Sequence, residues 1–144
     1  MSYKGKYKIK HPEKYKGNPT QCIFRSLWER KFMKFCDTND KILKWSSEEV
    51  RIPYISPVDK RFHYYYVDFW VLLEKNDGEK REYLIEIKPK RQLEKPKLKG
   101  NKKTYINEMK TYMINQEKWK SAEIYCSKRE WTFKIMTEKE LFGK

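Results

Sequence analysis

The sequence predicts an α/β fold in which helices flank a mixed β-sheet. The chain has 144 residues, which is typical of a single domain. Its apolar residues recur at helical spacing in some segments and at strand spacing in others. Aromatic residues form 16% of the chain, enough to build a core although 38% of the residues are charged. We therefore expect a basic N-terminal arm over residues 1–19 and a single folded domain over residues 20–144.

The elements of the first half follow from apolar spacing and from proline positions. Lysines and prolines predict an extended arm up to residue 19. Apolar residues at three- and four-residue steps predict a helix over residues 20–38, with Thr20 as its N-cap. Residues 42–55 read as one or two strands. Tyr, Phe, Trp and Val dominate residues 62–75, which predicts one long strand.

The second half continues with a hairpin and a long helix. Residues 76–78, Asn-Asp-Gly, predict a tight turn, and residues 82–88 form the returning strand. A basic loop bracketed by prolines leads to a helix over about residues 103–127. Residues 131–136 form a short strand. A last short helix over residues 137–142 begins with a capping box of Thr and Glu.

The positive charge is concentrated in two segments. The chain carries 34 basic and 20 acidic residues and a net charge of +14. Residues 1–16 hold six Lys and one Glu, and residues 88–103 hold eight basic residues and one Glu. Such segments attract polyanions, and DNA or RNA is the default partner. A solvated surface is the alternative interpretation, and neither segment has the apolar face that a membrane-binding helix needs.

The composition also indicates in which compartment the protein works. No apolar stretch approaches the roughly 20 residues of a membrane helix, and no apolar run follows the basic N-terminus as in a secretory signal. We therefore expect no membrane partner. Cys22, Cys36 and Cys126 are odd in number and widely spaced, so we predict neither a disulfide framework nor a zinc site. A reducing cytoplasm fits this pattern best.

Two carboxylates interrupt apolar strands, where an unpaired acid is costly. Asp68 lies in the first strand of the hairpin, and Glu86 lies in the second. Lys88 follows Glu86 by two residues and shares its face of the strand. If residues 76–78 form a three-residue loop, Asp68 lies directly opposite Glu86, with Cβ atoms about 5 Å apart.

Two carboxylates this close repel each other unless a cation lies between them. A hard divalent cation is the natural partner, and Mg²⁺ is the usual one beside phosphates. A two-residue loop would instead place the acids on opposite faces, and a bulge would shift the pairing. Alternatively, Glu86 pairs with Lys88 and Asp68 caps a strand end. Glu29 is not selected by such arguments, because a helical Glu is usually exposed and Arg25 is available to pair with it.

The segments around these residues resemble the PD-(D/E)xK nuclease superfamily. Asp68 and Glu86-Ile87-Lys88 match its motif, while Val67 stands where the family has proline. Residues 26–29, Ser-Leu-Trp-Glu, resemble the helix-borne acid motif of TnsA-type transposon endonucleases. Over essentially its whole length, the chain resembles the head completion nucleases of large contractile-tailed phages. The segments that carry this resemblance include Met1–Tyr7, Lys14–Gly17, Arg25–Phe32, Trp45–Glu49 and Ile52–Tyr54.

The resemblance implies a restriction-endonuclease-like core and a Mg²⁺-dependent DNA endonuclease, with Mn²⁺ as a substitute metal. It implies that this enzyme acts in phage head completion, during or after DNA packaging. The catalytic residues would be Glu29, Asp68, Glu86 and Lys88. The metal would be held by the three acids and the carbonyl of Ile87. The assignment of Glu29 rests on the resemblance alone.

Basic residues beside this site would clamp the phosphates of DNA, and tyrosines of the arm would stack on bases. The expected DNA-binding residues are Lys4, Lys6, Lys8, Lys10, Lys90, Arg91, Lys95, Lys97 and Lys99. Expected protein partners belong to the phage head or the head-neck region. The protein would work in the host cytoplasm during assembly or associate with the virion. The alternatives are a non-catalytic DNA-binding structural protein of the head-neck region, or a junction resolvase or transposon-end endonuclease on the same fold.

Overall fold

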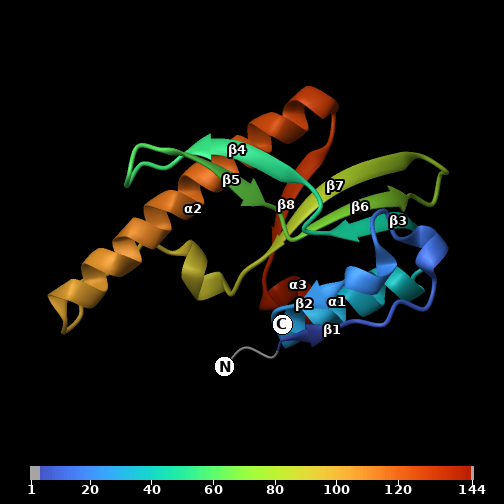
Figure 1. Ribbon diagram of the computed structural model, residues 1–144, viewed down its shortest axis with the longest axis horizontal. Helices are drawn as coiled ribbons and strands as arrows, with labels where there is room; N and C mark the ends of the chain where they lie inside the picture. Colours follow the sequence, from blue (N-terminus) through green and yellow to red (C-terminus); the bar gives the residue numbers. More distant parts are fainter. Residues whose placement is uncertain (1–3, 144) are drawn as a thin grey trace.

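A four-stranded mixed sheet forms the centre of the molecule, as the sequence predicts (Figure 1). The computed structural model describes residues 4–143. The strand order is β3-β6-β7-β8, in which β8 runs parallel to β7 and the other neighbours are antiparallel. The strands are β3 (Ile42–Ser47), β6 (Phe69–Glu74), β7 (Lys80–Ile87) and β8 (Thr132–Met136).

One helix covers each face of this sheet, so the fold is a three-layer sandwich (Figure 1). Helix α1 (Leu27–Thr38) packs on one face and helix α2 (Lys102–Arg129) on the other. The core beneath α1 contains Phe32, Met33, Cys36, Trp45, Phe69, Ile85 and Ile87. The core beneath α2 contains Trp70, Leu84, Trp119, Ala122, Cys126 and Phe133. Successive residues of β7 thus enter opposite cores, as in a strand buried on both faces.

The cysteines belong to these cores. All three are buried and free. Burial raises the pKa of the Cys126 thiol to about 11, which keeps it protonated and unreactive near neutral pH.

The first predicted helix begins later than expected. Ser26, not Thr20, is the N-cap, and its Oγ accepts a hydrogen bond of 3.1 Å from the Glu29 N–H. Thr20 lies instead in a short 3₁₀ turn, η2 (Pro19–Gln21). The proline at the start of this turn and the strand that follows it keep residues 20–26 out of the helix.

The second half matches the prediction closely. Helix α2 ends where Glu130 adopts a left-handed conformation. Helix α3 (Glu138–Phe142) follows β8 and begins with the predicted capping box, in which the Thr137 N–H donates to Glu140 Oε1 at 2.6 Å. Along residues 4–143, no helix combines the length and the apolar character that crossing a membrane requires.

The strand predicted over residues 62–75 is divided in two. Its first part is β5 (Phe62–Tyr66), which pairs with β4 (Arg51–Ile55) as a separate hairpin over α2, and its second part is β6. The chain changes partners at Val67 and Asp68. The Val67 N–H donates to the Val50 carbonyl at 3.1 Å, whereas the Asp68 carbonyl accepts from the Glu48 N–H at 3.0 Å. Asp68 therefore lies at a break between strands and not within one.

The predicted hairpin register is confirmed. The Lys75 N–H donates to the Glu79 carbonyl at 2.7 Å, which closes a three-residue loop over 76–78. Gly78 has a φ of +87°, a conformation that glycine adopts without strain. Along the strands Phe69 pairs with Ile85. The alternative two-residue loop and the alternative bulge between these strands are therefore wrong.

The N-terminal segment packs against the body of the protein. Strand β1 (Gly5–Lys6) pairs with β2 (Ile23–Phe24). Tyr7 and Tyr15 are only 9% and 8% exposed and lie in the core beneath α1. The expectation that these tyrosines stack on bases is wrong, because their rings fill the core instead. Tyr3, the remaining tyrosine of the arm, lies outside the described residues.

Lysines of this segment divide into two groups. The ammonium of Lys14 donates to the carbonyls of Cys36, Asp37 and Asn39 at 2.7, 3.2 and 2.9 Å, which satisfies the C-terminal end of α1. Lys14 is therefore structural. The four predicted DNA-binding lysines of the segment are exposed, namely Lys4, Lys6, Lys8 and Lys10.

A buried carboxylate fixes this segment to α1. Asp37 is fully buried and accepts hydrogen bonds from the Tyr7 hydroxyl at 2.9 Å and from the backbone N–H groups of Lys10 and His11 at 2.8 and 3.0 Å. Charged acceptors make stronger hydrogen bonds than neutral ones. Asp37 therefore compensates its own burial by ordering residues 7–11.

We expect Asp37→Ala to lower the free energy of unfolding by about 3 kcal/mol, because it leaves buried donors without a partner. Chemical denaturation of the variant and the wild type measures this difference. The control is Asp40→Ala, which removes an exposed carboxylate nearby and should change stability by less than about 0.5 kcal/mol. Equal stability of the two variants would show that Asp37 does not anchor the segment.

Candidate active site

Asp68 and Glu86 come together where β6 begins and β7 ends. Leu84 lies in the core beneath α2, so Glu86, two residues later, points to the same face of the sheet. The Ile87 N–H donates to Asp68 Oδ2 at 2.8 Å, and the Asp68 N–H lies 3.4 Å from Glu86 Oε1. The backbone of each strand end thus holds the carboxylate of the other, as the register predicts.

The Glu86 side chain is only 6% exposed, and a hydroxyl and an ammonium group lie next to its carboxylate. The Tyr65 hydroxyl donates to Glu86 Oε1 at 2.7 Å. The Lys88 ammonium lies 3.9 Å from Glu86 Oε2. The ion pair of Glu86 with Lys88, which the alternative interpretation anticipates, is therefore present together with the convergence of the two acids.

The two carboxylates are electrostatically strained. Burial, followed by the negative charge of Glu86, raises the pKa of Asp68 well above its ordinary value. Burial also raises the pKa of Glu86, against the lowering effects of the Tyr65 hydrogen bond and the Lys88 charge. Both acids would be stabilised as carboxylates by a further positive charge. Their oxygen donors fit the preference of a hard divalent cation such as Mg²⁺.

Glu29 lies near this pair without joining it. It is half-buried on α1, and the Arg25 N–H donates to its Oε1 at 3.1 Å. Burial raises the pKa of Glu29, the Arg25 N–H lowers it, and Glu48 raises it further. Within residues 4–143, no three Asp, Glu, His or Cys side chains group closely enough for a ready metal site. The reason is positional, because α1 covers the face of the sheet opposite to that of Glu86.

Three residues near the carboxylates were not selected from the sequence. Tyr65 is the inward residue of an alternating strand, which is the one sequence signal that marks it. Lys118 precedes buried Trp119 on α2, and its ammonium lies 5.5 Å from the centre of the Tyr65 ring. Glu48 has a left-handed φ of 54° and its carboxylate pairs with the Arg25 guanidinium. Glu48 lies in the Trp45–Glu49 segment that carries the family resemblance, and Lys118 is a lysine of a long basic helix, but nothing in the sequence assigned either residue a role at the site.

Lys118 experiences the charges of the site. Burial lowers the pKa of its ammonium, while Glu86 raises that pKa and Lys88 lowers it. Lys118 is half-buried, so its charge is less screened than that of a surface lysine. The Lys118 ammonium on α2 is therefore a second positively charged side chain, besides Lys88, that acts on the two acids.

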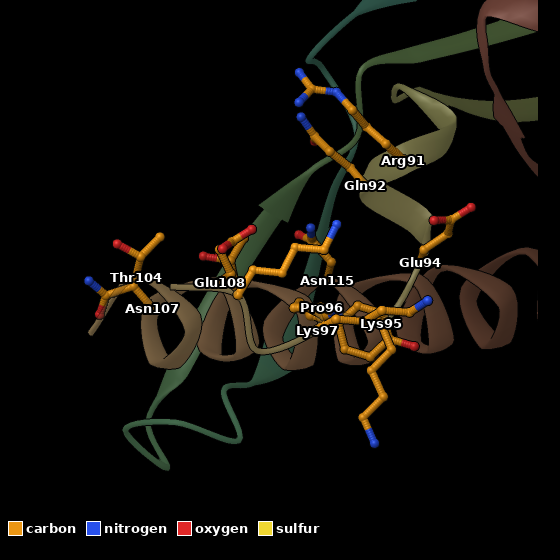
Figure 2. A pocket seen from close by; sticks show the side chains of 13 residues that line it. Arg91, Gln92, Glu94, Lys95, Pro96, Lys97, Thr104, Asn107, Glu108 and Asn115 are labelled. Carbon is orange, nitrogen blue, oxygen red and sulfur yellow. The ribbon is translucent and has the colours of Figure 1, made fainter. Parts of the chain in front are cut away.

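A basic groove runs along the N-terminal part of α2 (Figure 2). Its volume is about 740 Å³, and it lies between α2 and the loop that follows β7. The loop contributes four of the predicted DNA-binding residues, namely Arg91, Lys95, Lys97 and Lys99. The helix contributes polar side chains, among them Asn107 and Asn115. Lys90, the remaining predicted residue of the loop, does not line the groove, and its N–H donates to Glu138 Oε1 at 2.8 Å.

Comparisons with known proteins show the family to which the chain belongs. The chain is 36% identical over 143 residues to the head completion nuclease of Enterobacteria phage T4, with 96% of this chain and 93% of the phage protein covered. No solved structure matches the chain significantly. Residues 39–138 match the family model described as the TnsA-like endonuclease N-terminal domain, whose nuclease fold is of the PD-(D/E)xK type. The chain therefore belongs to the TnsA-like endonuclease family.

Proposed function

We propose that this protein is a Mg²⁺-dependent DNA endonuclease that hydrolyses phosphodiester bonds during phage head completion. The observation that carries the proposal is the convergence of half-buried Asp68 and buried Glu86 beside Lys88. The family supports the reaction class, and the T4 relative, whose name is head completion nuclease, supports the biological setting. DNA is the substrate, and proteins of the phage head or head-neck region are the proposed partners.

Each side chain has a role in this chemistry. Asp68 and Glu86 would hold the cation, with the carbonyl of Ile87, and Glu29 would contribute from α1, directly or through water. The bound cation would supply charge neutralisation at the scissile phosphate and lower the pKa of an attacking water. Lys88 neutralises the charge that develops on the phosphoryl oxygens. Tyr65 fixes the orientation of the Glu86 carboxylate through its hydroxyl.

Lys118 has a positioning role in this proposal. Its ammonium lies over the rings of Tyr65 and Tyr54, at 5.5 and 5.9 Å from their centres. This placement keeps a positive charge next to Glu86 and keeps the Tyr65 ring in place. A phosphate approaching Lys88 would therefore meet two cations from different layers of the fold.

We expect metal-dependent nicking of supercoiled plasmid that Glu86→Gln or Lys88→Met reduces by at least about 100-fold. Each substitution keeps the size of the side chain and removes its charge. The assay compares Mg²⁺, Mn²⁺ and EDTA. Controls at the far end of the hairpin are Glu79→Gln, just before β7, and Lys80→Met, at its first residue, both exposed and distant from the site. Normal DNA binding without cleavage of plasmid or branched DNA would instead establish a structural DNA-binding protein.

We expect Lys118→Met to lower the cleavage rate about tenfold, equivalent to about 1.4 kcal/mol of transition-state stabilisation. Lys118→Arg should recover most of this rate, because it restores the charge beside Glu86. Exposed Lys120 provides the matched control, Lys120→Met, on the same helix. Single-turnover cleavage at several pH values measures the effect. If methionine and arginine variants lose the same activity, the charge of Lys118 has no part in the reaction.

We expect the groove lysines to carry much of the salt dependence of DNA binding. Each phosphate contact contributes about 0.9 to the slope of log K against log salt concentration. The triple variant Lys95→Ala, Lys97→Ala, Lys99→Ala should therefore reduce the slope by about 2 to 3. A triple alanine variant of Lys41, Lys75 and Lys80 loses the same charge from exposed positions elsewhere. The same slope for both triple variants would mean that the groove does not contact phosphates.

A further inference from the structure

The β4–β5 hairpin presents an aromatic face to solvent. Residues of a strand alternate between its two faces, and here one face packs on α2 while the other is open. Phe62, Tyr64 and Tyr66 are 60%, 43% and 50% exposed, whereas Tyr65 between them is 3% exposed. Rings of this size are seldom left open in a row without a function. The open face is therefore a candidate binding surface.

The opposite strand completes this surface. Arg51 pairs with Tyr66, Pro53 with Tyr64, and Ile55 with Phe62. Directly paired residues share a face of a hairpin. The six side chains that we call the aromatic platform are Arg51, Pro53, Ile55, Phe62, Tyr64 and Tyr66, and none of them is acidic.

The positive charge on the platform favours an anionic partner. The Arg51 guanidinium lies 4.4 Å from the centre of the Tyr64 ring, so a cation is held among the rings. Residues 51–66 contain three basic residues and one acid, Asp59, which accepts hydrogen bonds from the Arg61 N–H and His63 at the hairpin tip. Planar rings with interleaved positive charge suit the bases and phosphates of unpaired nucleotides.

The platform leads directly to the proposed active site. Tyr66 precedes Asp68 by two residues, and Tyr65, on the reverse face of β5, donates to Glu86. In Figure 1 the hairpin crosses α2 and its base reaches the region where β6 begins. A strand of DNA whose bases stack along the hairpin would therefore run toward its base, where the chain continues from β5 into Asp68.

We propose that the aromatic platform binds unpaired nucleotides and directs DNA with a single-stranded segment to Asp68 and Glu86. This inference rests on the proposed endonuclease function and specifies its substrate class: flaps, gaps or frayed ends. Duplex bases are stacked on each other and cannot lie on the platform. The basic groove along α2 remains available for the phosphates of either kind of DNA.

The test is a binding measurement in EDTA, which is independent of cleavage. The variant combines Phe62→Val and Tyr64→Val, because valine removes the ring and keeps strand propensity. We expect the variant to lose at least about tenfold in affinity for an oligothymidylate, since each stacked base contributes substantially to binding. Its affinity for a blunt duplex should change less than about twofold. Fluorescence anisotropy measures both, and thermal unfolding confirms that the variant is folded.

Phe35→Ala is the matched control, because this exposed aromatic residue lies on α1, in the other helical layer. Photo-crosslinking with 5-iododeoxyuridine oligonucleotides adds a direct readout, with adducts expected on Phe62, Tyr64 or Tyr66. Unchanged affinity of the variant for oligothymidylate, or adducts confined to residues 88–101, would overturn the platform. A wild-type dimer that the variant converts to monomer would also overturn it, because the face would then bind a second copy. If the platform binds single-stranded DNA but the protein shows no metal-dependent cleavage, only the proposed endonuclease function would be overturned.

Discussion

A three-residue turn over 76–78 sets the register of β6 against β7, and this register brings Asp68 to Glu86. The Ile87 N–H then holds the Asp68 carboxylate at 2.8 Å. A slip of one residue would turn the Glu86 side chain into the core beneath α1 and would turn Ile85 and Ile87 toward α2. Because both faces of β7 are buried, the two cores enforce the register that the carboxylates need. The packing of the sheet and the chemistry of the site thus depend on the same alignment.

This alignment has a cost in stability. Two carboxylates this close repel each other, and desolvation disfavours the charge of each. Lys88, Tyr65 and the backbone offset part of this penalty but do not match the two charges in full. Proteins retain such unfavourable arrangements where function requires them. In the proposed function, the strong positive charge elsewhere in the chain would draw DNA toward a site whose carboxylates repel phosphates.

The sequence predicted most of the sheet, both long helices and the opposition of Asp68 to Glu86, because turn chemistry and alternation are local signals. It did not predict the strand break at Val67 and Asp68, because the chain changes there from pairing with β4 to pairing with β3 and β7, and that change depends on how the whole sheet assembles. Burial of Tyr7 and Tyr15 was missed because their hydrogen-bond partners, Asp37 and Ser47, are distant along the chain. No role for Lys118 could be predicted from the sequence, because only the packing of α2 on the sheet brings it near Glu86. The catalytic and metal-binding roles of Glu29, Asp68, Glu86, Ile87 and Lys88 remain predictions, and that of Glu29 rests on the family resemblance alone.

Calorimetric titration of the DNA-free protein with Mg²⁺ asks whether Asp68 and Glu86 form a cation site. We expect a single-site binding curve for the wild type that Asp68→Asn abolishes. We also expect Asp68→Asn to unfold at a higher temperature than the wild type in EDTA, because the substitution removes the repulsion between the two carboxylates. Equal Mg²⁺ uptake by both proteins, or none by the wild type, would contradict a cation site at Asp68 and Glu86.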